Sequence, residues 1–166
     1  MFLDCKQLFD IPGETVVIDY ELDLSDYELF SVKPFQTKVW IKGMAQNRAG
    51  IVSLNMNCSF LMSLCCDRCL DEFEKAFSYD FSHILVRELY SDEADENDYI
   101  VVEEDKLDLK ELALSDILLS LPTKILCKED CLGLCPMCGT NLNHDACQCN
   151  KKQVDPRLAK LSELLK

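Results

Sequence analysis

The chain has 166 residues, a length that suits one compact domain with room for a small appended module. A hydrophobic content of 48% is ample for a buried core and argues against global disorder. The formal net charge of −13 argues against broad electrostatic wrapping of nucleic acid, because such a chain repels polyphosphate.

No targeting or membrane-spanning segment is predicted. The first residues contain neither a long apolar run nor a small-residue cleavage site, and no segment approaches the roughly 18 apolar residues of a membrane span. We therefore expect a cytoplasmic protein. In a reducing compartment its 11 cysteines are better candidates for metal ligands than for disulfides, and the odd count also fits a disulfide framework poorly.

Alternating apolar and polar residues predict four strands in the first half of the chain. They cover 15–24, 36–45, 52–64 and 73–85, and the turn composition of residues 47–50 predicts a hairpin between the second and third. The inward face of the third strand is the longest: Val52, Leu54, Met56, Cys58, Phe60, Met62 and Leu64. Cys58 is therefore expected to be a small buried hydrophobe and not a ligand.

The pair Cys66-Asp-Arg-Cys69 lies between the third and fourth predicted strands. A two-residue gap lets both sulfurs reach about 2.3 Å from one metal ion, so this hairpin tip is a candidate zinc knuckle. The competing interpretation is a thiol-redox or metal-handling protein that uses the Cys-x-x-Cys pairs, because the thioredoxin-type motif has the same gap and Arg68 could lower a thiol pKa. That motif opens a helix after a strand, however, whereas both flanks here look like strands.

Residues 88–105 contain nine acidic and no basic side chains, and a short apolar piece, Tyr99 to Val102, lies near the end of this range. We interpret them as a solvated acidic loop before an edge strand. An acidic surface that attracts a basic partner is the alternative. A nuclease would need such acids to bind magnesium, and we rank that function last.

A Leu-rich helix is predicted after the acidic run. Asp108 and Glu111 resemble a capping box, and Pro122 ends the helix. The expected core stripe consists of Leu109, Leu112, Ile117 and Leu121.

The C-terminal segment carries a charge opposite to that of the rest of the chain. Asp155-Pro156 predicts the start of a short helix. Residues 150–166 hold five basic and two acidic side chains, a local charge of +3 against −16 for the remainder. Four of these bases are candidate contacts to nucleic acid or a partner: Lys151, Lys152, Arg157 and Lys160.

Six cysteines follow the Leu-rich helix: Cys127, Cys131, Cys135, Cys138, Cys147 and Cys149. With Cys66 and Cys69 they supply eight ligands, enough for two four-thiolate zinc sites, and iron would also suit four sulfurs. We prefer a compact zinc ribbon of Cys135, Cys138, Cys147 and Cys149, with Cys127 and Cys131 joining Cys66 and Cys69, because the ribbon then closes the smaller loops. Spacing also allows Cys127, Cys131, Cys135 and Cys138 to share one ion while Cys147 and Cys149 join the tip.

Four thiolates leave no open position for water or substrate, so both sites are expected to be structural. Gly139 should adopt the left-handed turn that aims amides at sulfur. His144 could substitute as a ligand but is interpreted as a surface residue, and His83 as a structural one. Phosphate-loop, nucleophile-elbow and zinc-protease motifs are absent from the sequence, so no enzyme and no small-molecule substrate are predicted.

The expected fold is α+β. It combines an antiparallel β-sheet, open or barrel-like, with the Leu-rich helix, the zinc ribbon and a short C-terminal helix. Residues 1–126 would form the β-rich domain with the cysteine tip, and residues 127–166 a zinc-ribbon module packed on it.

Three signatures occur in order along the chain: Cys66-Asp-Arg-Cys69-Leu70, the run from Leu121-Pro122 through Cys135-Pro-Met-Cys138-Gly to Asn143, and Asp155-Pro-Arg157-Leu-Ala159. In these the sequence resembles the YceD-like family, the large ribosomal RNA subunit accumulation proteins. The resemblance implies a role in synthesis, processing or stability of 23S rRNA and transfers no catalytic activity. With the charge, it implies an adaptor that binds the large-subunit precursor through a basic protein or a local rRNA contact.

Overall fold

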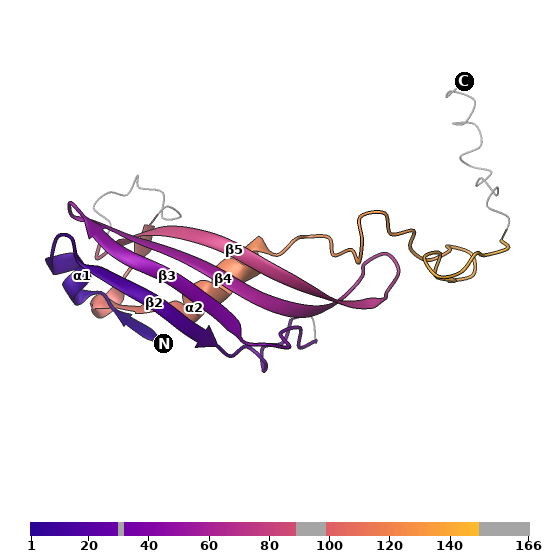
Figure 1. Ribbon diagram of the computed structural model, residues 1–166, viewed down its shortest axis with the longest axis horizontal. Helices are drawn as coiled ribbons and strands as arrows, with labels where there is room; N and C mark the ends of the chain where they lie inside the picture. Colours follow the sequence, from indigo (N-terminus) through magenta and orange to yellow (C-terminus); the bar gives the residue numbers. More distant parts are fainter. Residues whose placement is uncertain (30–31, 89–98, 150–166) are drawn as a thin grey trace, which may run out of the picture. The chain divides into compact units, whose positions relative to one another are not determined.

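The computed structural model describes residues 1–29, 32–88 and 99–149 (Figure 1). The chain divides into two compact units, Met1–Leu64 with Glu72–Ile125, and Cys65–Asp71 with Leu126–Lys166. We call the first the sheet unit and the second the cysteine unit. The cysteine unit thus joins the tip segment to residues more than fifty positions further along the chain.

The sheet unit contains a five-stranded sheet in the order β2-β3-β4-β5-β6. Its strands are β2 (Thr15–Leu22), β3 (Val39–Arg48), β4 (Ile51–Cys65), β5 (Glu72–Val86) and β6 (Tyr99–Val101). β3 runs antiparallel to both β2 and β4, so that Gly43 lies opposite Ile18 on one side and Met56 on the other. β6 runs parallel to β5, with Ile100 opposite Leu85.

Short elements complete the sheet unit. β1 (Phe2–Asp4) pairs antiparallel with β7 (Lys106–Asp108) in a second, two-stranded sheet. α1 (Lys6–Asp10) follows β1, a 3-10 turn covers Glu103–Asp105, and α2 (Leu109–Ser120) follows β7. The predicted α+β class is confirmed.

The sheet is not closed into a barrel, and the predicted antiparallel pairing holds for β2, β3 and β4 but not for β6. In the described part of the chain β2 and β6 are the two edges of an open sheet, and β6 pairs parallel with its neighbour. Barrel closure needs a full ladder between the first and last strands. A last strand of three residues cannot supply that ladder.

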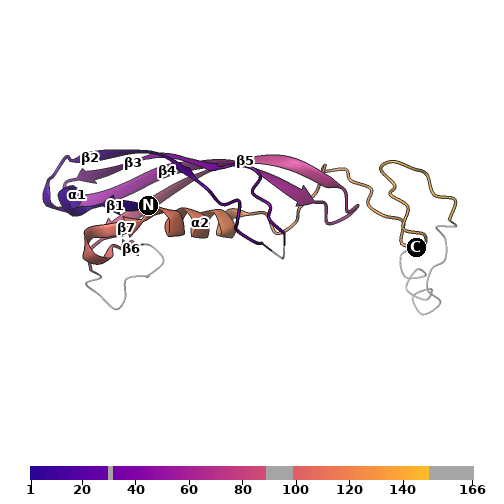
Figure 2. The same ribbon diagram turned by 90° about the horizontal axis from the view of Figure 1, so that it is seen from below.

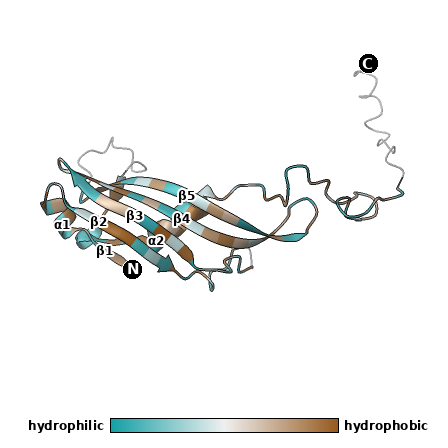
Figure 3. Cartoon of the chain, in the orientation of Figure 1, coloured by the Kyte–Doolittle hydropathy of each residue, from teal (hydrophilic) through white to brown (hydrophobic). Residues whose placement is uncertain are grey.

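The period-two pattern of β4 forms the centre of the core. All seven predicted inward residues, from Val52 to Leu64, are at most 8% exposed, and Cys58 is fully buried as expected. Figure 3 shows polar and apolar residues alternating along these strands, and Figure 2 shows α2 beneath one face of the sheet. The sheet is therefore covered on one side by the helix that the sequence predicted.

The buried face of α2 differs from the predicted stripe. Leu109, Ala113 and Ile117 are fully buried, at a spacing of four residues, whereas Leu112 and Leu121 are only partly buried. A small side chain at Ala113 permits close approach to the sheet, which the Leu pattern alone did not indicate. Asp108 caps the helix by accepting a hydrogen bond from the Lys110 amide at 2.9 Å.

The hairpin between β3 and β4 depends on one buried amide. Asn47 is 1% exposed; its Nδ2 donates to the Leu8 carbonyl at 2.7 Å and its Oδ1 accepts from the Gly50 amide at 2.9 Å. Ala49 and Gly50 both have positive φ, 53° and 89°, as a tight hairpin turn of the mirror-image type requires. Asn47 thereby fixes the turn to α1.

We expect Asn47→Ala to lower the free energy of unfolding by about 2–3 kcal/mol, because a buried carbonyl and a turn amide both lose their partners. Urea denaturation measures the loss. Asn55→Ala, at an exposed position of β4, is the matched control and should change stability by less than about 0.5 kcal/mol. Equal effects of the two substitutions would contradict this role of Asn47.

Several predicted features lie outside the described residues. These are the C-terminal helix beginning at Asp155, most of the acidic run 88–105, and the four candidate contact residues Lys151, Lys152, Arg157 and Lys160. The short apolar piece after the acidic run is β6, an edge strand as predicted. None of the helices among the described residues is long and apolar enough to cross a membrane.

Candidate metal centres

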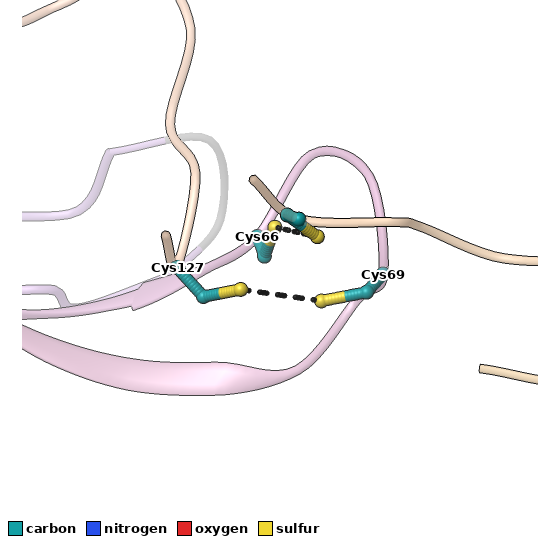
Figure 4. A group of neighbouring side chains, drawn as sticks. Cys66, Cys69 and Cys127 are labelled. Carbon is teal, nitrogen blue, oxygen red and sulfur yellow. Dashed lines mark hydrogen bonds between the residues drawn. The ribbon is translucent and has the colours of Figure 1, made fainter. Parts of the chain in front are cut away.

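Four cysteines from two distant segments meet in the cysteine unit. Cys66 and Cys69 come from the turn after β4, and Cys127 and Cys131 follow α2; their sulfurs all lie within 4.8 Å of one another. The Cys66–Cys131 and Cys69–Cys127 sulfur distances are 3.8 and 3.6 Å, and Figure 4 shows the sulfurs of Cys69 and Cys127 facing each other. We call these four residues the tip cluster.

The remaining four cysteines form a second group, which we call the loop cluster. Cys135, Cys138, Cys147 and Cys149 also have sulfurs within 4.8 Å of one another, and Cys147 lies 3.5 Å from Cys135. Cys135 is buried, whereas Cys138 is exposed. Of the two groupings that spacing allowed, the structure forms the one that keeps residues 135–149 together.

The sulfur spacing suits a tetrahedral ion. Four sulfurs held at 2.3 Å from a common centre are about 3.8 Å apart, close to the separations in both clusters. Either cluster could therefore hold a metal ion, with all four positions filled by sulfur and none left for water or substrate. This arrangement favours a structural ion over a catalytic one.

The two Cys-x-x-Cys turns have the same backbone hydrogen bonds. In the tip cluster the Cys66 amide donates to the Asp71 carbonyl at 2.9 Å and the Leu70 amide donates to the Cys66 carbonyl at 2.9 Å. In the loop cluster the Cys135 amide donates to Thr140 at 2.8 Å and the Gly139 amide donates to Cys135 at 2.9 Å. The chain thus builds one knuckle twice.

Each knuckle also places one residue in the left-handed region at the same position. Gly139 has φ 75°, as predicted, and its counterpart Leu70 has φ 62°. Glycine adopts this conformation without strain, whereas leucine adopts it at a cost. A glycine directly after Cys138 makes the turn of the loop cluster recognisable from the sequence. The turn of the tip cluster has Leu70 at that position and is harder to recognise.

Backbone amides point at the first sulfur of each knuckle. Burial raises the pKa of the Cys66 thiol, but hydrogen bonds from the Cys127, Arg68 and Cys69 backbones outweigh it and lower the pKa to about 6. Hydrogen bonds from the backbones of Cys138 and Met137 likewise lower the pKa of Cys135 to about 6. A thiolate at neutral pH is the form that binds metal.

Other thiols of the same clusters resist ionisation. Burial raises the pKa of Cys69, and hydrogen bonds to neighbouring cysteines add to the effect. A hydrogen bond to Cys138, with burial, raises the pKa of Cys149 to about 12. Four thiolates cannot crowd together without a cation, so binding of a metal ion must displace protons.

Polar side chains that the sequence reasoning missed surround the tip cluster. Asp71 accepts hydrogen bonds from Asn141 Nδ2 on both carboxylate oxygens, at 2.8 and 2.9 Å, and Asn143 Nδ2 donates to the Cys131 sulfur at 3.3 Å. The Nε2 atom of His144 lies 2.9 Å from Asp71 Oδ2. His144 is exposed and belongs to neither cluster, in agreement with its prediction as a surface residue. The only sequence signal for this set is its place beside the cysteine motifs.

Gly133 and Gly139 provide a matched pair for a test of the cysteine unit. Both have positive φ, 76° and 75°. A Cβ at Gly133 would lie 2.9 Å from the Arg68 carbonyl oxygen, whereas a Cβ at Gly139 would meet nothing within 4 Å. We expect Gly139→Ala to cost about 1 kcal/mol from strain alone and Gly133→Ala about 2–4 kcal/mol from strain and the clash. Thermal unfolding of the metal-loaded chain measures both, and equal losses would contradict the close approach to Arg68.

An open α+β sheet unit joined to a unit built on two four-cysteine clusters defines a protein with paired candidate structural metal centres. Comparison with known proteins identifies the family. Residues 54–165 match the family described as "Large ribosomal RNA subunit accumulation protein YceD", and the chain belongs to that family.

Curated bacterial proteins resemble the chain over different lengths. The Bacillus subtilis (strain 168) protein described as "Uncharacterized protein YlbN" is 30% identical over 162 residues, covering 96% of this chain and 94% of that protein. The Mycobacterium tuberculosis (strain ATCC 25618 / H37Rv) protein described as "Uncharacterized protein Rv2926c" is 40% identical over 77 residues, 45% of this chain and 36% of that protein. No solved structure matches the chain.

Proposed function

We propose that this chain is a non-enzymatic, zinc-binding factor of the cytoplasm that supports synthesis, processing or stability of 23S rRNA. Membership of a family described by accumulation of the large ribosomal RNA carries the biological part of the proposal. Two clusters of four sulfurs at tetrahedral spacing carry the chemical part. The ions would stabilise the fold of the cysteine unit. Other proteins would catalyse the reactions of rRNA processing.

Zinc is the proposed ion in both clusters. Eight thiolates would hold two ions, and iron is the alternative because it also binds four sulfurs in a tetrahedron. Elemental analysis of protein purified without added metal tests the proposal. Two zinc ions per chain are expected, whereas stoichiometric iron, or no bound metal, would overturn this part.

We propose that the chain acts as an adaptor to a basic ribosomal protein or to the large-subunit precursor. A formal charge of −13 favours a basic protein partner, and the local +3 of residues 150–166 favours a restricted contact there. The proposed contact residues are Lys151, Lys152, Arg157 and Lys160. Pull-down with and without ribonuclease separates a protein contact from an RNA contact.

The biological test is a deletion strain complemented with variants. Loss of the gene should lower mature 23S rRNA, and the wild-type chain should restore it. Reversal of the four proposed contact charges should abolish co-sedimentation with ribosome precursors while two metal ions stay bound. Unchanged co-sedimentation would remove the basic segment from the proposal, and normal 23S rRNA in the deletion strain would remove the rRNA role.

A thiol-redox or metal-handling function of the Cys-x-x-Cys pairs is the alternative, and the lowered pKa of Cys66 is the observation in favour of redox chemistry. Against it, Cys66 is fully buried and its sulfur faces Cys131 at 3.8 Å, in a turn between two strands. Structural centres should resist a thiol-alkylating reagent until a chelator removes the metal. Rapid alkylation of Cys66 in the metal-loaded chain would favour redox chemistry.

A further inference from the structure

The loop cluster and the tip cluster are joined by side chains of one short loop. Residues 139–146 connect Cys138 to Cys147, the two inner ligands of the loop cluster. Three side chains of this loop reach the tip segment or its cluster. Asn143 donates to the Cys131 sulfur, whereas Asn141 and His144 contact Asp71, two residues after Cys69. A metal ion bound by the loop cluster would therefore also position side chains that contact the tip segment and its cluster.

Asp71 is the first of the two connections. Asn141 holds both carboxylate oxygens, and His144 contacts Oδ2. The Cys69 thiol in turn donates to Asp71 Oδ2 at 3.3 Å, and the Asp71 carbonyl accepts from the Cys66 amide at 2.9 Å. Asn141 thus anchors the residue that closes the tip knuckle.

Asn143 is the second connection, and it is direct. Its Nδ2 donates to the Cys131 sulfur at 3.3 Å, while its Oδ1 accepts from the Leu132 amide at 2.9 Å. An amide donor spreads the negative charge of a ligating thiolate and fixes the direction of its sulfur. Asn143 therefore orients Cys131 from a loop whose ends belong to the other cluster.

The loop holds its own shape through Asn141. The Asn143 amide donates to Asn141 Oδ1 at 3.0 Å, and the Asp145 amide donates to the Asn141 carbonyl at 3.0 Å. With Cys138 and Cys147 on a common ion, the eight residues between them form a closed ring whose conformational entropy is already reduced. Without that ion the loop is not ordered in advance. Placing Asn143 against Cys131 then costs conformational entropy, and this cost lowers the affinity of the tip cluster for its metal ion.

Building on the proposed metal binding, we infer that the two centres load cooperatively, with Asn141 and Asn143 carrying the coupling. Linkage makes the effect reciprocal, so each bound ion raises the affinity of the other cluster by the same factor. Outer hydrogen bonds of this kind change metal affinity by about 10- to 100-fold. We expect a coupling factor of about tenfold.

Three chains titrated with Co²⁺ against a competing chelator measure the coupling, because Co²⁺ bound to four thiolates is followed by its absorption. They are the intact chain, Cys147→Ser/Cys149→Ser with the tip cluster alone, and Cys66→Ser/Cys69→Ser with the loop cluster alone. The product of the two binding constants in the intact chain should exceed the product of the single-cluster constants by about tenfold. Equal products would overturn the inference without requiring any asparagine variant.

Asn143→Ala assigns the coupling to its residue. The substitution should lower the factor in the intact chain to the part that Asn141 carries through Asp71, and it should leave both single-cluster constants unchanged. Asp145→Ala, at an exposed position in the same loop, is the matched control and should keep the full factor. An equal loss of tip affinity with and without the loop cluster would show a purely local role and overturn the assignment.

Failure of this inference is distinguishable from failure of the proposed function. If neither single-cluster chain nor the intact chain binds Co²⁺ with a four-thiolate absorption spectrum, the metal-binding proposal itself fails. If both clusters bind Co²⁺ and the product of the binding constants in the intact chain equals the product of the single-cluster constants, the metal-binding proposal stands and only the coupling is lost.

Discussion

In the proposed metal-bound chain, replacing Cys66 with serine is expected to release one of the two ions and to unfold the segments around the tip cluster, while the neighbouring Cys65→Ser keeps both ions. Cys66 is fully buried with its sulfur 3.8 Å from Cys131. Cys65 is exposed, donates to the Leu70 carbonyl at 3.3 Å and lies outside both clusters. Adjacent positions with opposite expectations make this a stringent test of the site.

The expected effect is large because metal binding supplies folding free energy in such sites, on the order of 10 kcal/mol per ion. The described part of the cysteine unit has a single isolated β-bridge, Leu134 to Asn141, and little other regular structure to hold it. The sheet unit has its own core and should remain folded. Loss of the ion should therefore be local.

Native mass spectrometry counts the ions, and hydrogen exchange locates the unfolding. Cys66→Ser should retain one ion, in the loop cluster, and lose amide protection in residues 65–71 and 126–134, with β3 and β4 still protected. Retention of two ions by Cys66→Ser, or loss of one by Cys65→Ser, would contradict the assignment of the tip cluster.

The strands were predictable because one physical rule dominates them. Each strand of the main sheet buries one face, so a period of two in apolar residues identifies β2, β3, β4 and β5 before any tertiary information. The edge strand β6 was also located, from its apolar run. Its parallel direction depends on the path of the chain and leaves no trace in side-chain periodicity.

The smallest elements were missed for a different reason. β1 and β7 have three residues each and α1 has five, too few for a period to be recognised. They exist because they pair with each other or pack on the core, as Leu3 and Leu8 do. Tertiary contacts, and not local preference, determine such segments.

The candidate ligands were predictable, whereas their surroundings were not. A two-residue gap between cysteines has a metal-binding geometry by itself, which indicated Cys66/Cys69 and Cys135/Cys138; the other four candidates came from their place in the same Cys-rich run. Asp71, Asn141 and Asn143 acquire their roles only when the tip and the loop meet in space. Asparagine and aspartate are ordinary turn residues, and the sequence gives no reason to single them out.

A partly buried contact between helix and sheet is the basis of the second large prediction, that Asp116→Ala lowers the free energy of unfolding of the sheet unit by about 2–4 kcal/mol. His83 Nε2 on β5 lies 2.8 Å from Asp116 Oδ2 on α2, with the two side chains 18% and 12% exposed. His83 was expected to be structural, and this contact gives the reason. Alanine at position 116 would leave the imidazole without its partner under the helix.

The pKa of Asp116 provides the discriminating measurement. Burial raises it, and the hydrogen bond and charge of His83 partly oppose that rise. A carboxyl whose folded pKa lies above its unfolded value is destabilising once ionised, so stability falls as pH rises through that range and returns on acidification. Removing His83 takes away both opposing contributions and should raise the pKa of Asp116 further, which NMR titration of that carboxyl in His83→Ala measures.

Urea unfolding followed by the fluorescence of Trp40, the single tryptophan, reports on β3 and hence on the sheet unit and not on the metal centres. Asp116→Asn is the matched control: it keeps a hydrogen-bonding group of the same shape and should lose less stability than Asp116→Ala. A double-mutant cycle of His83→Ala with Asp116→Ala should show a coupling of about 1–3 kcal/mol. Additive losses, or an unchanged pKa of Asp116 in His83→Ala, would mean that the contact between α2 and β5 is held by the apolar core alone.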